Sequence, residues 1–176
     1  MNKTKFSAKV ITLYPELFPG PLSASVTGRA LKKRIWSLEL IDLRQYGRGK
    51  HKQVDDKPIS GGPGMILRPD VLDDAILGAL DSTSYKHCPV VCMSPKGSPL
   101  TQDLAKNFLQ YNEVIIVCGR FEGIDQRVIE KHKMMEISIG DFILTGGELG
   151  AMVLLDTVVR LLPGTLGNAE SILNES

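Results

Sequence analysis

Ile137-Ser-Ile-Gly-Asp-Phe-Ile-Leu-Thr-Gly-Gly-Glu148 joins a short β-like run to the apolar helical pattern that follows it. Its glycines allow the backbone to fold tightly around a ligand. Apolar side chains beside exposed amide donors suit a cofactor with an aromatic ring and a sugar better than a bare phosphate. Taken alone, the stretch fits a well-capped strand-to-helix turn equally well, so the neighbouring segments decide between the two readings.

Segments with strand-like and helix-like patterns alternate around this stretch. The most strand-like is Glu113 to Cys118, which is almost wholly apolar and β-branched. The other expected strands are 8–14, 38–43, 88–93 and 135–139, and the expected helices are 25–35, 69–80, 101–110, 125–131 and 148–162. Continuous apolar strands separated by helices predict an α/β fold with a mostly parallel sheet and helices on both faces.

Three successive strands of this predicted sheet end in turns rich in Gly, Ser or Pro. The turns are Ser94 to Gly97, Gly119 to Gly123 and Gly140 to Gly147. Ligands of parallel α/β sheets bind beyond the carboxyl ends of the strands. One such turn is routine, but three at the same edge favour a ligand site.

A long segment from Arg44 to Met65 is dominated by Gly, Pro and charged residues. Its basic half can contact phosphates and its glycine half can approach a ligand closely, although a solvated loop explains the charges as well. No Gly-Lys-Ser/Thr ends the glycine run, and no third glycine follows Gly62 and Gly64 at dinucleotide spacing. ATP and NAD sites of the usual kinds are therefore not indicated.

Length and composition are those of a single soluble globular domain. The 176 residues include 21 Lys and Arg against 20 Asp and Glu, so nucleic-acid binding would require a local basic patch. Cys88, Cys92 and Cys118 lie in or beside apolar runs and are expected to be buried free thiols. No run of 18 apolar residues and no signal peptide is apparent, which predicts a cytoplasmic protein.

A series of short motifs resembles one enzyme family over nearly the whole chain. The chain is similar to the amino-terminal domain of the bacterial tRNA (guanine(37)-N1)-methyltransferases, which belong to the SPOUT family of knotted methyltransferases. The resemblance is carried by Thr27-Gly-Arg-Ala30, Val54-Asp-Asp-Lys-Pro58, Gly61-Gly-Pro-Gly-Met65, Ser94-Pro95, Cys118-Gly-Arg-Phe-Glu-Gly-Ile-Asp125, Ser138-Ile-Gly-Asp141, Gly146-Gly-Glu-Leu149, Pro163-Gly164 and Leu166-Gly167.

This resemblance implies a deep trefoil knot in the cofactor-binding region, which strand periodicity cannot reveal because true knots are almost absent from proteins. It implies transfer of a methyl group from S-adenosyl-L-methionine (SAM) to N1 of guanine 37 in tRNA, next to the anticodon. It also implies a homodimer with the active site at the subunit interface. By similarity, the cofactor-binding residues are Met93, Ser94, Pro95, Gly119, Phe121, Glu122, Ser138, Ile139, Gly140, Asp141, Phe142, Ile143, Leu144, Gly146 and Gly147.

Catalytic roles are implied for Arg160, Glu175 and Glu122. A carboxylate can remove the N1 proton and an Arg can stabilise charge on the guanine O6. Arg160 matches the family's Arg, although its spacing from Asp156 also fits an i,i+4 ion pair. Glu175 stands where the family has Asp, one methylene longer. Family members are described as magnesium-dependent, but no dedicated Mg²⁺ site is evident in the sequence, and no metal ligand is assigned.

The resemblance divides the chain into a SAM-binding catalytic domain, residues 1–164, and the start of an interdomain linker, residues 165–176. The family also has a carboxy-terminal tRNA-binding domain, which by this resemblance we expect to be absent from this chain. We therefore expect these 176 residues to fold, dimerise and bind SAM but to methylate tRNA poorly.

Two other functional classes remain open from the residues themselves. A non-catalytic RNA-binding module that uses the Arg44 to Lys57 segment would bind tRNA without responding to SAM. A structural dimerisation domain would show no thermal shift with SAM. Near-zero net charge, one Trp and four Tyr speak against a stacking platform for RNA.

Overall fold

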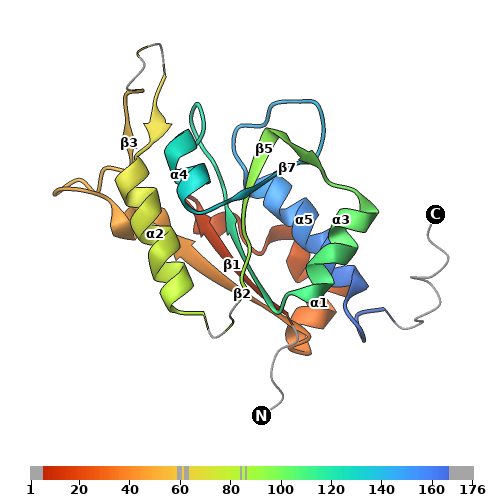
Figure 1. Cartoon of the computed structure of the whole chain (residues 1–176). Helices are drawn as coiled ribbons and strands as arrows, with labels where there is room; N and C mark the ends of the chain where they lie inside the picture. The colour runs from red at the N-terminus through yellow and green to blue at the C-terminus, as the bar shows by residue number, and fades with distance from the viewer. Residues whose placement is uncertain (1–5, 59–60, 62–63, 84, 86, 167–176) are drawn as a thin grey trace.

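The computed structural model describes residues 6–58, 61, 64–83, 85 and 87–166. Its centre is a five-stranded sheet formed by β1 (Phe6–Thr12), β2 (Trp36–Asp42), β5 (Val90–Pro99), β6 (Glu113–Val117) and β7 (Met135–Ser138). The strand order is β2-β1-β6-β5-β7 and every pairing is parallel. The predicted α/β parallel sheet is thus confirmed (Figure 1).

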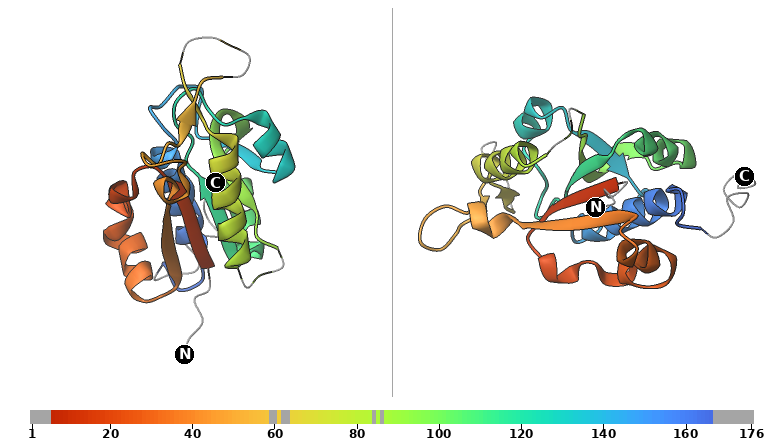
Figure 2. Two further views of the ribbon diagram at one scale, coloured as in Figure 1. Left: turned by 90° about the vertical axis from the view of Figure 1, so that its left-hand side faces the viewer. Right: turned by 90° about the horizontal axis from the view of Figure 1, so that it is seen from below.

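Helices cover both faces of this sheet (Figure 2). One face packs against α1 (Ser25–Lys32), α3 (Gln102–Asn107) and α5 (Glu148–Leu161), and the other against α2 (Pro69–Asp81) and α4 (Gln126–Lys131). Short 3₁₀ helices lie at Pro15–Leu17, Gly20–Ser23, Leu43–Tyr46 and Phe108–Gln110. A small antiparallel pair, β3 (Asp55–Asp56) with β4 (Ile66–Leu67), lies within the long glycine-rich and charged segment and the residues just after it.

Alternate residues of the central strand β6 serve two separate cores. Val114 and Ile116 pack with the α5 side, while Ile115 and Val117 pack with the α2 side. All four side chains are at most 1% exposed. A strand buried on both faces must be apolar at every position, which explains why this run has the clearest strand signal in the sequence.

Start signals of two helices appear as the sequence predicts. Pro69 occupies the first turn of α2, where a backbone N–H would have no hydrogen-bond partner within the helix. Thr101 caps α3 by accepting a hydrogen bond from the Leu104 amide at 3.1 Å. The α1 helix ends at Lys32, earlier than expected, and Arg34 just beyond it has a left-handed backbone with φ of 56°.

The expected turn at Ser94 to Gly97 lies inside a strand instead of after one. β5 continues to Pro99, and its pairing with β7 shifts register between Met93 and Ser98. A side chain at Gly97 would overlap the Glu136–Ile137 peptide. The missing Cβ therefore lets β5 bulge and then return to the same partner strand, a departure that the apolar pattern does not signal.

The amino-terminal edge of the sheet holds a buried ion pair. Lys9 Nζ lies 3.2 Å from Glu113 Oε1, and the two side chains are only 3% and 7% exposed. The same ammonium donates to the Ala79 carbonyl at 3.0 Å and to Ser82 Oγ at 2.7 Å. These contacts tie the end of α2 to β1 and β6, and they satisfy a charge that would otherwise be costly to bury.

No helix in the described part of the chain is long and apolar enough to cross a membrane.

We predict that Lys9→Met destabilises the fold by about 3–5 kcal/mol, because it leaves the Glu113 carboxylate buried and unpaired. Urea unfolding measures the loss. The control is Lys106→Met, which removes an exposed pair with Asp103 and should cost less than about 1 kcal/mol. Adding Glu113→Leu to Lys9→Met should recover part of the stability. A loss for Lys9→Met no larger than that of the control would contradict this account.

Candidate functional site

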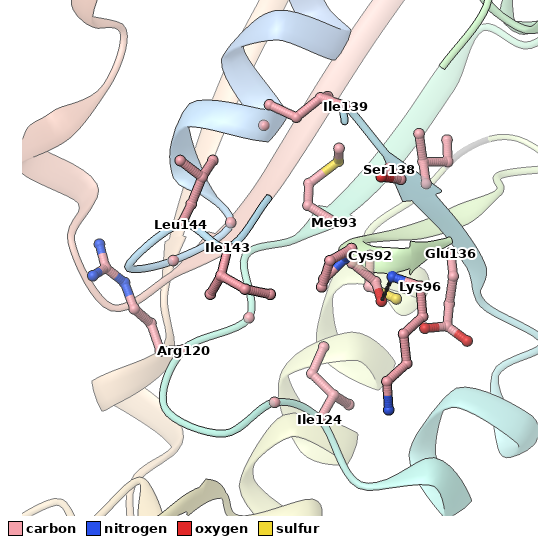
Figure 3. Close-up of a pocket in the computed structure, with 18 of the residues that line it drawn as sticks. Cys92, Met93, Lys96, Arg120, Ile124, Glu136, Ser138, Ile139, Ile143 and Leu144 are labelled. Atoms are coloured by element: carbon pink, nitrogen blue, oxygen red, sulfur yellow. Dashed lines mark hydrogen bonds between the residues drawn. The ribbon is translucent and has the colours of Figure 1, made fainter. Parts of the chain in front are cut away.

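A cavity of about 400 Å³ lies beyond the carboxyl ends of β6, β5 and β7. Its walls come from three chain segments, 92–96, 119–124 and 136–147, with further contributions from α4 and the start of α5. Figure 3 shows the side chains that these segments direct towards the space. Two of the predicted glycine-rich turns and the bulge inside β5 therefore do meet at one site, as expected for a parallel α/β sheet.

Two of these segments are joined directly through their backbones. The Gly147 N–H donates to the Gly119 carbonyl at 2.9 Å. A Cβ at Gly147 would lie 2.9 Å from both Cys118 Cα and the Gly119 nitrogen. Only glycine permits this approach, so the pair Gly146-Gly147 is required by packing as well as by the turn.

The loop from β7 to α5 begins with a local clasp at Ser138. Ser138 Oγ donates to the Gly140 carbonyl at 3.0 Å, and the Gly140 amide donates back to Ser138 Oγ at 3.2 Å. The Leu100 amide donates to the Ser138 carbonyl at 2.7 Å. Beyond this clasp Phe142, Ile143 and Leu144 are exposed, with Ile143 81% accessible.

Arg120 connects the two joined segments by its side chain. Its Nη2 lies 2.8 Å from Glu148 Oε2, its Nε donates to Glu148 Oε1 at 3.2 Å, and its Nη1 donates to the Thr145 carbonyl at 3.1 Å. The Nη2 contact is an ion pair without the alignment of a hydrogen bond, since Oε2 has no hydrogen-bond donor in the described structure. Thr12 Oγ1 also donates to Glu148 Oε1, at 2.8 Å. Glu148 is 2% exposed, so this network fixes a buried carboxylate under the cavity floor.

Tyr14 extends this arrangement towards the basic segment. The Arg120 guanidinium lies 4.4 Å from the centre of the Tyr14 ring and the Arg44 guanidinium 5.3 Å from it. Both distances are within the range of cation–π attraction. Arg44 also donates to the Leu13 carbonyl. Arg44 is thus held by the protein itself.

Arg48 likewise serves the fold. It pairs with Asp70 and Asp74 on α2, with N–O distances of 2.8 Å and 2.5 Å. Hydrogen bonds from Arg68 and Arg48 lower the pKa of Asp70 to about 2. Lys50 and Lys52, at the tip of the same loop, are exposed. Only part of the predicted basic segment is therefore available to contact phosphates.

Glu122 lies at the rim of the cavity with its side chain exposed. Its amide donates to the Met65 carbonyl at 2.9 Å. A Cβ at Gly64 would lie 2.6 Å from Glu122 Cγ. Glycine at this position therefore allows the segment before β4 to lie against the Glu122 side chain. The preceding Phe121 has a left-handed backbone, φ of 60°, and is 49% exposed. Such strain in a non-glycine residue is commonest at functional sites.

The cysteines are free, as the sequence predicts, with Cys92 and Cys118 buried and Cys88 partly buried. Burial, with the nearby Glu136 carboxylate as a smaller cause, raises the pKa of Cys92 to about 12. Burial raises the pKa of Cys118 well above its ordinary value. These thiols stay protonated at neutral pH and do not act as nucleophiles. Within the described ranges, no group of three or more His, Cys, Asp or Glu side chains could hold a metal ion.

Fourteen of the fifteen residues assigned to the cofactor from the resemblance line this cavity. The exception, Asp141, lines a smaller adjoining hollow together with Pro95, Ser138, Ile139 and Gly140. Arg160 is in the last turn of α5 and is not among the lining residues. Glu175 lies outside the described residues.

Sequence reasoning missed several lining residues. They are Cys92, Lys96, Arg120, Gly123, Ile124, Gln126, Ile129, Glu136, Ile137, Thr145 and Gly150. Most lie within or beside the three predicted turns and could have been found by extending them. Gln126 and Ile129 could not, because only tertiary packing brings α4 to the cavity.

Comparison with known proteins gives one consistent result. A family model described as tRNA (Guanine-1)-methyltransferase TrmD matches residues 6–176. A tRNA (guanine-N(1)-)-methyltransferase from Jannaschia sp. is 53% identical over 171 residues, which are 96% of this chain and 69% of the relative. The enzyme of the same name from Ehrlichia canis is 49% identical over 97% of this chain and 72% of its own length.

Structural comparison agrees with the sequence comparison. The crystal structure of tRNA (m1G37) methyltransferase from Aquifex aeolicus superposes with a TM-score of 0.83 at 35% identity, over 94% of this chain and 73% of that chain. The resemblance read from the short motifs is thereby confirmed, and this chain belongs to the tRNA (guanine-N1)-methyltransferase family.

Proposed function

We propose that this chain binds SAM in the cavity beyond β6, β5 and β7 and transfers its methyl group to N1 of guanine 37 in tRNA. The activity itself, tRNA (guanine-N1)-methyltransferase, follows from membership of the family. The position of the cofactor is supported by one observation above all. Four of the segments that carry the family motifs, 94–95, 118–125, 138–141 and 146–149, converge on this cavity.

The residues present fit a nucleoside cofactor. A volume of about 400 Å³ lies within the range of small-molecule sites. Exposed apolar side chains of the 139–147 loop offer surface for an aromatic base, and the loop's backbone offers amides and carbonyls to the base and sugar. When bound, SAM supplies a methyl group already activated on a sulfonium. The protein must therefore place the acceptor nitrogen in line and manage its proton.

Glu122 is proposed to act on the guanine. It is an exposed carboxylate at the cavity rim and makes no ion pair with any described residue. An unpaired carboxylate there can accept a hydrogen bond from the guanine and hold it for methyl transfer. Two backbone features precede and hold Glu122. Phe121 has a left-handed backbone, and the Glu122 amide donates a hydrogen bond to the Met65 carbonyl.

The roles of Arg160 and Glu175 imply a second subunit. Arg160 follows Glu148 by twelve residues along α5, which places it about 18 Å from the cavity end of the helix. If both ends of α5 act on one guanine, a partner copy must supply one of them. The homodimer with its active site at the interface is thus part of the proposal, as is the role of Glu175 as base.

An apolar surface is available for that dimer. Phe142, Ile143, Leu149 and Val153 are between 44% and 81% exposed and come from the cofactor loop and the adjoining face of α5. Exposed apolar groups gathered in this way favour a protein interface.

The trefoil knot is proposed for the segment from β7 to α5. The Gly147 to Gly119 hydrogen bond and the close approach of Gly147 to Cys118 bring this segment tightly against the end of β6. The division into residues 1–164 and a linker, a further tRNA-binding domain and magnesium dependence stay predictions from the resemblance. No step is assigned to a metal, because the described residues form no metal-ligand group.

Gly119→Leu should abolish SAM binding without unfolding the chain. A Cβ at Gly119 meets only Ile124 side-chain carbons, at 3.7 Å, so the backbone tolerates it, while the longer side chain fills the cavity. Calorimetric titration of SAM measures binding, and urea unfolding checks the fold. Ser98→Leu, at an exposed site on β5 outside the cavity lining, is the control. Undiminished SAM binding by folded Gly119→Leu would place the cofactor elsewhere.

Glu122→Gln should slow methyl transfer about 100-fold, because it removes the negative charge that is proposed to hold the guanine, while SAM affinity stays near that of the parent. Single-turnover transfer of labelled methyl groups to tRNA separates the two quantities. Glu39→Gln, at an exposed site on β2, serves as the matched control. Parental rates for Glu122→Gln would remove this residue from the chemistry.

Val153→Asp should turn the dimer into a monomer, since it places a charge within the apolar surface on α5. Sedimentation velocity gives the oligomeric state. Leu77→Asp changes a side chain of similar exposure, 41%, on α2 and should leave the dimer intact. A parent chain that sediments as a monomer at micromolar concentration would contradict the proposed interface.

A further inference from the structure

Arg120 lines the cavity but has no role so far in binding or in chemistry. Its guanidinium is occupied by groups of the protein itself, the Glu148 carboxylate and the Thr145 carbonyl. Figure 3 shows this side chain reaching beside the loop that carries Ile143 and Leu144. An arginine engaged in this way acts on the loop and leaves the ligand to other residues.

Between its two ends this loop has few contacts of its own. It begins at the Ser138 clasp, and residues 141–144, which are exposed, form no hydrogen bond with any described residue. The next anchors are the Thr145 carbonyl, which accepts from Arg120 at 3.1 Å, and the Gly147 amide. The contact with Arg120 is therefore the first point at which the chain is held again after its exposed stretch.

The loop also packs directly on the ion pair that Arg120 forms. A Cβ at Gly146 would overlap Arg120 Nε and would lie 2.6 Å from Glu148 Oε2, so glycine lets the backbone rest on the pair. Glu148 is 2% exposed and also accepts from Thr12 Oγ1 at 2.8 Å. The Tyr14 ring centre lies 4.4 Å from the Arg120 guanidinium. These contacts fix the guanidinium independently of any ligand.

We propose that Arg120 is a positioning residue that holds the 139–147 loop in the conformation that binds SAM. It acts through the Thr145 carbonyl and takes no part in the chemistry. This inference rests on the proposed function, because it names what shapes that same site. A loop that is held in advance needs little free energy to become ordered when SAM binds. Loosening the Arg120 contact should therefore weaken SAM binding without slowing methyl transfer once SAM is bound.

Arg120→Lys separates these two effects. A lysine keeps a cation beside Glu148 but lacks the planar fork that reaches Glu148 and Thr145 together. Calorimetric titration should show SAM binding weakened about tenfold, while the single-turnover rate at saturating SAM stays near that of the parent. Hydrogen exchange, measured without SAM, should become faster in peptides from 139–147 and stay unchanged in β6.

A second variant, Arg120→Met with Glu148→Met, removes both charges at once. No unpaired charge then stays buried, so the fold should keep most of its stability in urea while the loop loses its anchor. This variant should show the same faster exchange in 139–147 and the same loss of SAM affinity. Arg48→Lys is the matched control and should change neither quantity. Arg48 likewise pairs with carboxylates and donates to the Asp70 carbonyl, at 3.3 Å, but lies outside the cavity lining.

If the parent chain binds SAM and both Arg120 variants keep its SAM affinity, the inference is overturned while the proposed function stands. Exchange that quickens equally in β6 and in 139–147 would also overturn it, because Arg120 would then serve the fold as a whole. A parent chain that does not bind SAM would overturn the proposed function, and the inference with it.

Discussion

The site depends on the contact between the end of β6 and the start of α5, where the Gly147 amide meets the Gly119 carbonyl at 2.9 Å. A side chain at Gly147 would not permit it, because Cys118 Cα and the Gly119 nitrogen would lie 2.9 Å from its Cβ. The buried Glu148 and the Arg120 that it holds reinforce the same contact from below. The 139–147 loop that follows β7 lines the cavity, and its apolar side chains Phe142, Ile143 and Leu144 are exposed.

Charged side chains are paired at one end of the sheet and unpaired at the other. At the amino-terminal edge, Lys9 and Glu113 are buried, paired and fully bonded, which is how a charge contributes to a stable fold. At the carboxyl edge, Glu122, Lys96 and Glu136 line a cavity and form no ion pair with any described residue. Charges left unpaired at a cavity are available for binding and proton transfer. This difference agrees with the position of four family motifs, 94–95, 118–125, 138–141 and 146–149, at the cavity.

The strands, the helices and the three convergent turns could be predicted from the sequence because each has a local cause. Val114 to Val117 must be apolar at every position to serve two cores, and Pro69 and Thr101 mark helix starts by their own chemistry. The bulge at Gly97 could not be predicted, since its cause is a contact with Glu136 some forty residues away. The roles of Gln126 and Ile129 as lining residues depend on the same kind of long-range packing. The cofactor, the acceptor base and the knot came from family resemblance, because periodicity and spacing carry no information on threading or on substrate.

The most direct test of the central claim is to map the methyl group. The chain is incubated with methyl-labelled SAM and tRNA that carries guanine 37, and the product is digested and analysed by mass spectrometry. This account predicts 1-methylguanine at position 37, formed slowly by these 176 residues. It also predicts loss of this product when adenine replaces that guanine, and in Gly119→Leu, whose cavity is filled. A methyl group at another position, or labelling that persists when the cavity is filled, would contradict it.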